Sequence, residues 1–124
     1  MQMRLQLGLA MLACYVLVGC HTTQPPVTRE ALVGSYAYKS QDPEGRATDH
    51  EWDNLTLQAD GKYHLVQGGP TRLTSEVVGA WTLRAGANGS EVLLDHSGYP
   101  IQMKRNEVRL FIDNDVGIWY SKAR

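Results

Sequence analysis

Residues 55–66 read "LTLQADGKYHLV". In the first half, Leu55 and Leu57 alternate with polar residues, which is the pattern of a strand with one buried face. The Asp60–Gly61 dipeptide follows, and Asp-Gly between two alternating segments is the strongest short-range signal for a β-hairpin. Alternation resumes in YHLV after the dipeptide. The stretch therefore predicts two antiparallel strands joined by a tight turn.

Outward from this hairpin, the chain consists of short β-like runs separated by turn residues. GSYAYKS places Tyr36 and Tyr38 on one face of a strand, and EVRLFID does the same for Val108, Leu110 and Ile112. Further strands are predicted at RLTSEVV (72–78), GAWTLR (79–84), EVLLD (91–95), PIQMK (100–104) and IWYSK (118–122). Turns are predicted at GGPT (68–71), AGANGS (85–90), HSGY (96–99), RN (105–106) and NDVG (114–117).

The order of these runs decides the fold class. Eight or nine short strands with essentially no crossover helices indicate an all-β antiparallel meander. Such a sheet has to protect its edges, and closure into a small barrel is the usual solution. We therefore predict an up-and-down β-barrel of about eight strands over residues 32–124. The interior of such a barrel is filled by side chains or holds one small ligand.

The N-terminus has the form of a secretory signal, with one positive charge at Arg4 and a leucine-rich run after it. The run is short for a membrane span, which needs about 20 apolar residues, so a retained anchor is the weaker alternative. Leu17-Val18-Gly19-Cys20 resembles the lipobox of bacterial lipoproteins. The resemblance implies cleavage between Gly19 and Cys20 and lipidation of Cys20, with Cys14 removed together with the signal peptide.

On this interpretation residues 1–19 are the signal peptide, and residues 20–31 are the lipidated cysteine and a Pro-containing tether. Thr28 is a possible N-cap for a helical turn in REAL. His21 stands where lipoproteins retained in the inner membrane commonly have Asp, which implies an outer-membrane anchor facing the periplasm, or less favourably the cell exterior. The chain has 12 Lys and Arg against 13 Asp and Glu without like-charge blocks, so we expect no nucleic-acid partner.

The motifs of the β-rich region also resemble a known group. GSYAY, LTLQADGKYHL, VGAWTL, EVLLD and RNEVRLFIDNDVGIWY look like the small lipocalin-like bacterial lipoproteins typified by the NlpE N-terminal domain. The resemblance spans roughly residues 32–120 and implies a lipocalin-like barrel. That family carries a Cys-x-x-Cys in its first hairpin region, whereas YKSQDPEGRATDHEW here has no cysteine. The copper and envelope-stress roles tied to those cysteines therefore do not carry over.

No catalytic constellation is evident. The chain lacks a G-x-S-x-G nucleophile motif and a glycine-rich phosphate loop, so we predict neither an enzyme nor a bound cofactor. His50, His64 and His96 are weak candidates for a metal site, because their spacing matches no compact ligand motif. The Asp113–Gly117 segment resembles the start of a calcium loop, but a hairpin turn is the preferred interpretation.

Aromatic residues are the better candidates for a binding surface, since Tyr and Trp combine a large apolar body with a polar end. The candidates are Tyr36, Tyr38, Trp52, Trp81 and Trp119, with a core role the stronger alternative for Trp81. We predict a lipid-anchored barrel that binds a small apolar ligand or an envelope protein. The alternative is an immunity-type lipoprotein that inhibits a periplasmic toxin enzyme through the loop at residues 40–54.

Overall fold

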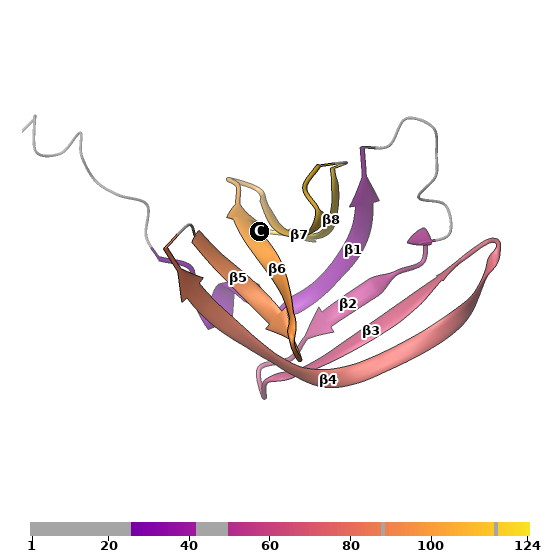
Figure 1. Cartoon of the computed structure of the whole chain (residues 1–124), viewed down its shortest axis with the longest axis horizontal. Helices are drawn as coiled ribbons and strands as arrows, with labels where there is room; N and C mark the ends of the chain where they lie inside the picture. The colour runs from indigo at the N-terminus through magenta and orange to yellow at the C-terminus, as the bar shows by residue number, and fades with distance from the viewer. Residues whose placement is uncertain (1–25, 42–49, 88, 116) are drawn as a thin grey trace, which may run out of the picture.

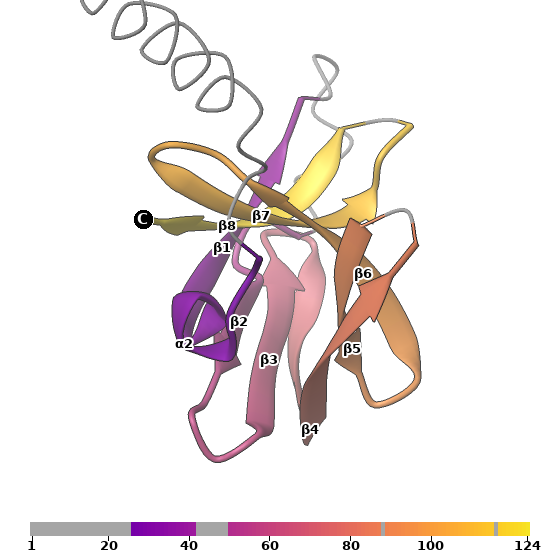
Figure 2. The same ribbon diagram turned by 90° about the vertical axis from the view of Figure 1, so that its left-hand side faces the viewer.

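The computed structural model describes residues 26–41, 50–87, 89–115 and 117–124. The predicted signal peptide and the predicted lipidation site at Cys20 therefore lie outside the described residues. The elements are α2 (Arg29–Leu32), β1 (Gly34–Ser40), β2 (Asn54–Leu57), β3 (Lys62–Gly69), β4 (Arg72–Gly86), β5 (Gly89–Leu94), β6 (Ser97–Met103), β7 (Glu107–Asp113) and β8 (Ile118–Ala123). Each strand is antiparallel to its neighbours, and β1 pairs with β8 to close an eight-stranded barrel (Figures 1 and 2). The predicted fold class is confirmed.

The hairpin predicted from the Asp-Gly dipeptide is confirmed as the β2–β3 connection. The N–H of Gln58 donates to the carbonyl of Lys62 at 2.9 Å, and Gly61 adopts φ +87°. Asp60 accepts a bond from the N–H of Lys62 at 3.0 Å, which fixes the turn. Glycine is required here because a side chain disfavours this left-handed backbone conformation.

Strand β4 corrects one expectation. The sequence predicts two strands at 72–78 and 79–84, whereas the structure has one strand of 15 residues. Its first part pairs with β3 as far as Ala80, and its second part pairs with β5 from Trp81 onward. The glycine between the two parts does not break the strand, because Gly79 lies directly opposite Tyr63 in the ladder. The ring of Tyr63 occupies the space that a side chain at Gly79 would need.

The turns alternate between the two ends of the barrel, as they must in an up-and-down sheet. Helix α2, the β2–β3 turn, the β4–β5 hairpin and the β6–β7 turn lie at one end, which we call the closed end. Residues 50–53 and the β3–β4 and β7–β8 turns lie at the other, which we call the open end. The β5–β6 turn also follows this alternation, but the 15-residue β4 staggers it to the level of the β2–β3 turn, because Asp95 bonds to Ala80 and Ala80 pairs with Lys62. Figure 1 shows the β3–β4 hairpin projecting beyond the other strands at the open end.

Helix α2 covers the closed end. Thr28 caps it as predicted, because its hydroxyl accepts the N–H of Ala31 at 3.3 Å. Leu32 is completely buried, and the hydroxyl of Tyr36 donates to the Leu32 carbonyl at 2.6 Å. This bond joins the helix to the first strand of the barrel.

Among the described residues, the core fills the interior and is made mainly by residues of the barrel and α2. Its largest fully buried side chains are Trp81, Tyr36, Leu32, Leu55, Leu57, Leu110, Val92 and Val108. Because the whole cluster lies between Leu32 and Tyr120, residues 26–124 contain their own core. The strand pattern predicts Ile112 on the same face as Val108 and Leu110, but Ile112 is 40% exposed. The β7–β8 register shifts between Phe111 and Asp113, which breaks the alternation there.

Candidate functional site: the open end of the barrel

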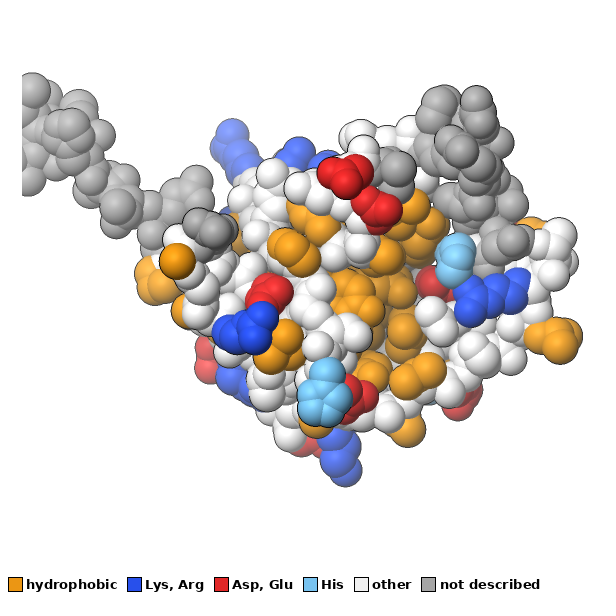
Figure 3. All heavy atoms as spheres, in the orientation of Figure 1, with side chains coloured by type: hydrophobic (Ala, Val, Ile, Leu, Met, Phe, Trp, Pro, Cys, Tyr) orange, Lys and Arg blue, Asp and Glu red, His pale blue; other side chains and the backbone are white. Residues whose placement is uncertain are grey.

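Four rings line the entrance at the open end, and we call them the aromatic mouth. Tyr38 stacks on His50 with centroids 5.4 Å apart and meets Tyr120 edge-on at 6.4 Å. Tyr99 lies 6.3 Å from Tyr120. In the space-filling view, hydrophobic side chains gather at the centre of the face between β6 and strands β1 to β3 (Figure 3). The mouth therefore presents aromatic surface where the closed end presents a helix.

A buried carboxylate supports the aromatic mouth. Asp53 is 4% exposed, and its Oδ1 accepts the N–H of Gly68 at 2.9 Å. His50 Nδ1 lies 3.1 Å from Asp53 Oδ2 and 3.0 Å from Arg72 Nη1. One ring nitrogen either donates to the carboxylate or accepts from the guanidinium, so these two contacts are alternatives set by the protonation and tautomer of the ring.

The buried tyrosines of the mouth remain neutral phenols. Burial raises the pKa of Tyr120, and the nearby Asp53 carboxylate raises it further. Burial also raises the pKa of Tyr99. The mouth consequently offers uncharged tyrosine faces, and Asp53 and Arg72 are the charged groups of the described chain that contact its histidine.

The first half of β4 has a free edge at the open end. β5 pairs only from Trp81 onward, so the part of β4 toward Arg72 has β3 on one side and, in the residues that the structure describes, no strand on the other (Figure 1). The N–H and C=O of Ala80 point away from β3, since both bond to Asp95. Backbone direction alternates along a strand, so Glu76 and Val78 also point their N–H and C=O away from β3. Within the described parts of the chain these four groups have no partner.

Apolar side chains flank this edge. Leu73 is 92% exposed, Val78 74% and Val77 39%. A hollow of about 540 Å³ lies over the β3–β4 pair near this edge. Val78 and Ala80 line it on the β4 side, and Gln58 and Lys62 line it on the side away from the free edge. Exposed apolar side chains next to unpaired backbone groups are what natural sheets usually cover or avoid.

Asp95 limits the free edge at Ala80. It lies in the β5–β6 turn with φ +53°, and its carboxylate accepts the N–H of Ala80 at 3.1 Å and the hydroxyl of Tyr63 at 2.7 Å. The Tyr63 bond, followed by the Ala80 bond, lowers the pKa of Asp95. Burial and the bond to Asp95 raise the pKa of Tyr63 to about 12. Asp95 therefore satisfies the N–H and C=O of Ala80, as a neighbouring strand would satisfy those of Glu76 and Val78.

Two of the predicted binding residues lie in the core rather than at the mouth. Tyr36 is fully buried, and Trp81 is 1% exposed. The indole Nε1 of Trp81 donates to the carbonyl of Gln58 at 2.7 Å, and the guanidinium of Arg29 lies 4.2 Å from the ring centroid. These contacts tie the hairpin and α2 together, so Trp81 is a structural residue of the closed end.

Trp119 lies on the outer wall, away from Tyr120, which points inward. Its Nε1 donates to Glu107 at 3.0 Å, and the same carboxylate accepts bonds from Ser121 at 2.5 Å and from Arg109 at 2.7 Å. Burial alone would raise the pKa of Glu107, but these three bonds and the charge of Arg109 together lower it to about 2. This cluster stabilises the β7–β8 pair.

The remaining predicted binding residues, Tyr38 and Trp52, lie in the mouth and beside it. Trp52 is 56% exposed, and its N–H donates to the Gly68 carbonyl at 2.9 Å. The candidate histidines are separated: His50 lies in the mouth, His64 faces outward 3.5 Å from Glu76, and His96 occupies the β5–β6 turn. The described residues contain no group of three metal-ligating side chains.

Sequence reasoning missed Asp53, Arg72 and the free edge at Glu76 and Val78. In the sequence Asp53 is only one member of an acidic segment, and its burial depends on the contact with Gly68 fifteen residues away. RLTSEVV has the pattern of an ordinary strand. That only one of its edges is paired depends on the registers of β3 and β5, which no local pattern contains.

Within the described ranges, no helix has the length and apolarity needed to cross a membrane. Comparisons of the chain with family models, curated proteins and solved structures found no match. The function is therefore inferred from the residues and geometry of the two barrel ends.

Proposed function

We propose that the protein is a periplasm-facing lipoprotein, anchored in the outer membrane through Cys20, whose open end binds an extended segment of an envelope protein. The free edge of β4 is the observation that carries the binding proposal. The lipobox resemblance at Leu17–Cys20 carries the anchor. The barrel serves as a binding module and not as an enzyme.

The chemistry of the free edge selects the class of partner. Glu76 and Val78 offer two N–H donors and two C=O acceptors in alternating order, and another extended backbone complements that order. Strand addition of this kind takes its affinity from main-chain bonds and its specificity from pockets for alternate side chains. The hollow beside Val78 and Ala80 is suited to one such side chain.

An interior apolar ligand, the other form of binding considered from the sequence, has less support. Trp81, Tyr36 and the leucines fill the barrel toward the closed end. Among the described residues, the aromatic mouth is the part of the barrel interior left for a small molecule, and it lies beside the projecting β3–β4 hairpin. We propose that the mouth accommodates a side chain of the bound segment.

Proline substitution at the free edge tests the binding proposal. Val78→Pro removes an N–H that makes no ladder bond, so the β3–β4 pairing keeps its bonds while the edge loses a donor. With a photo-crosslinking amino acid at Leu73 of the full-length lipoprotein in cells, the wild type should give a discrete adduct. Val78→Pro should abolish that adduct, and the matched Val78→Thr variant, which keeps the N–H, should retain it. An adduct unaffected by the proline would overturn strand addition, and an adduct with a second copy of this chain would replace the partner with a homodimer.

The anchor has its own test. Cells labelled with palmitate should show lipid on the wild-type protein and none on Cys20→Ser. Label retained in Cys20→Ser would contradict the lipidation site, whatever the outcome at the open end.

The immunity-type alternative remains a second candidate because of Trp52. Its 56% exposure, next to the projecting hairpin, gives the surface at residues 50–53 an aromatic anchor for a protein partner. A secreted hydrolase as the stoichiometric adduct, with its activity inhibited by the purified barrel, would favour this candidate over a scaffold.

A further inference from the structure

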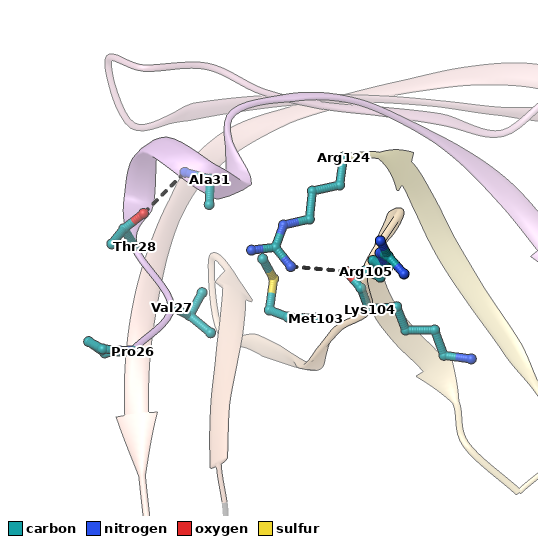
Figure 4. Close-up of a pocket in the computed structure, with 8 residues that line it drawn as sticks. All are labelled: Pro26, Val27, Thr28, Ala31, Met103, Lys104, Arg105 and Arg124. Carbon is teal, nitrogen blue, oxygen red and sulfur yellow. Dashed lines mark hydrogen bonds between the residues drawn. The ribbon is translucent and has the colours of Figure 1, made fainter. Parts of the chain in front are cut away.

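A groove at the closed end lies where the tether meets the barrel. Its volume is about 540 Å³, and it lies between residues that precede or belong to α2 and the β6–β7 turn (Figure 4). The apolar side of the lining consists of Val27, Ala31 and Met103. The basic side consists of Lys104, Arg105 and Arg124, and none of the described lining residues is acidic.

Arg124 is held in place by bonds to backbone carbonyls of the β6–β7 turn. Arg124 Nη1 donates to the Lys104 carbonyl at 3.0 Å, and the Arg124 N–H donates to the Asn106 carbonyl at 3.0 Å. Figure 4 shows the Arg124 guanidinium reaching toward Met103 and the helix, while Lys104 extends away from the centre of the groove. The remaining guanidinium N–H groups of Arg124 are therefore available to an acceptor in the groove. Planar guanidinium donors match the oxygens of a phosphate group.

The position of the groove identifies where that phosphate comes from. Pro26, at the start of the described chain, belongs to the groove lining and is six residues from Cys20. Six residues span at most about 20 Å when fully extended. With Cys20 lipidated, the groove thus stays within about 20 Å of the bilayer and its headgroups.

We propose that this groove binds the phosphate headgroup of an anionic phospholipid in the membrane that holds the anchor, with the apolar side against the glycerol and upper acyl chain. The inference rests on the proposed lipid anchor for the source of the ligand. It makes the closed end a membrane-docking surface and fixes the orientation of the barrel, so that the free edge of β4 points into the periplasm.

Vesicle binding tests the groove independently of lipidation. The sample is the unacylated chain from His21 onward, which contains the described core of the barrel. It is mixed with phosphatidylcholine vesicles, either pure or containing about 30% phosphatidylglycerol, which makes the vesicle surface strongly anionic. Only the phosphatidylglycerol vesicles should bind. Each basic residue near an anionic surface changes affinity about fivefold, so Arg124→Gln, which removes the guanidinium that faces the groove, should weaken binding about fivefold. The matched control Lys39→Gln removes the same single charge at the open end and should bind like the wild type.

Three outcomes would overturn the proposal. One is equal binding to both vesicle types, and another is equal weakening by the groove and control variants. The third is binding of inorganic phosphate in the groove without binding to either vesicle, which would make the ligand a free anion. Failure of Cys20 to take up palmitate affects none of these measurements, so the groove and the anchor are refuted separately.

Discussion

The two ends of the barrel are built from the same strands but are finished differently. At the closed end, α2 buries Leu32, and Trp81 bonds to the backbone of the hairpin below it. At the open end, tyrosine rings line an uncovered mouth, and β4 leaves one edge unpaired. Basic side chains outnumber acidic ones among the described residues of the closed end, which has Arg29, Lys62, Arg84, Lys104, Arg105, Lys122 and Arg124 against Glu30, Asp60, Glu91 and Glu107. Acidic side chains outnumber basic ones among the described residues of the open end, which has Glu51, Asp53, Glu76, Asp113 and Asp115 against Lys39 and Arg72.

This difference separates stability from recognition. The closed end contains the groups whose loss costs the most, and the open end contains surface that the fold does not need for its own core. A charge gradient along the barrel would also orient it against an anionic bilayer, with the acidic end away from the lipid. Substitutions at the closed end should therefore mainly lower stability, and substitutions at the open end should have smaller effects on stability and mainly weaken the proposed partner binding.

The largest expected effect compares two tryptophans. Trp81→Ala removes a 1% exposed ring together with its bond to Gln58 and should lower the free energy of unfolding by about 3–5 kcal/mol. Trp52→Ala, at a 56% exposed position of the open end, should cost less than about 1 kcal/mol. Urea unfolding followed by circular dichroism measures both. Similar losses for the two variants would remove the distinction between the ends.

The outer wall that joins the two ends should give the next largest effect, and it depends on pH. The pKa of Glu107 is about 2 in the folded protein against an ordinary value of 4.5. A lowered carboxyl pKa contributes stability that is complete above 4.5 and disappears as the pH falls from about 4.5 to about 2. A pKa shift from 4.5 to about 2 corresponds to about 3 kcal/mol of stability. Because the side chain is partly exposed and solvent screens its charge, we expect about 2 kcal/mol. Tm measured from pH 2 to 6 should fall less steeply in Glu107→Gln, and identical pH profiles would contradict this role.

Most of the fold could be predicted from the sequence because its signals are local. The Asp60–Gly61 turn, the Thr28 cap and the inward pair Tyr36 and Tyr38 depend on neighbours in the chain. The site could not be predicted in the same way. The free edge at Val78 exists because β5 pairs with β4 only from Trp81, which is a matter of barrel stagger and not of local pattern.

A buried carboxylate at the open end sharpens the comparison on a smaller scale. Asp53→Asn removes the charge that faces His50 while leaving an oxygen for the Gly68 N–H, and should cost about 1.5 kcal/mol. The matched Asp60→Asn changes an exposed carboxylate in the closed-end turn and should change stability by less than about 0.5 kcal/mol. Chemical denaturation of both variants at neutral pH measures the difference. A larger loss for Asp60→Asn than for Asp53→Asn would contradict a stabilising role for the buried carboxylate of the open end.

The smallest expected effect concerns the bond that holds α2 over the closed end. Tyr36→Phe deletes the hydroxyl that donates to the Leu32 carbonyl and leaves the buried ring in place, so the loss should be about 1 kcal/mol. Because that bond is the link between α2 and β1, amide hydrogen exchange should accelerate in α2 and stay unchanged in β3 and β4. The variant should also bind anionic vesicles more weakly, since α2 forms one side of the groove, while the adduct at the free edge remains. Loss of that adduct in Tyr36→Phe would mean that the two ends are coupled, and the division between a membrane-facing end and a partner-facing end would then fail.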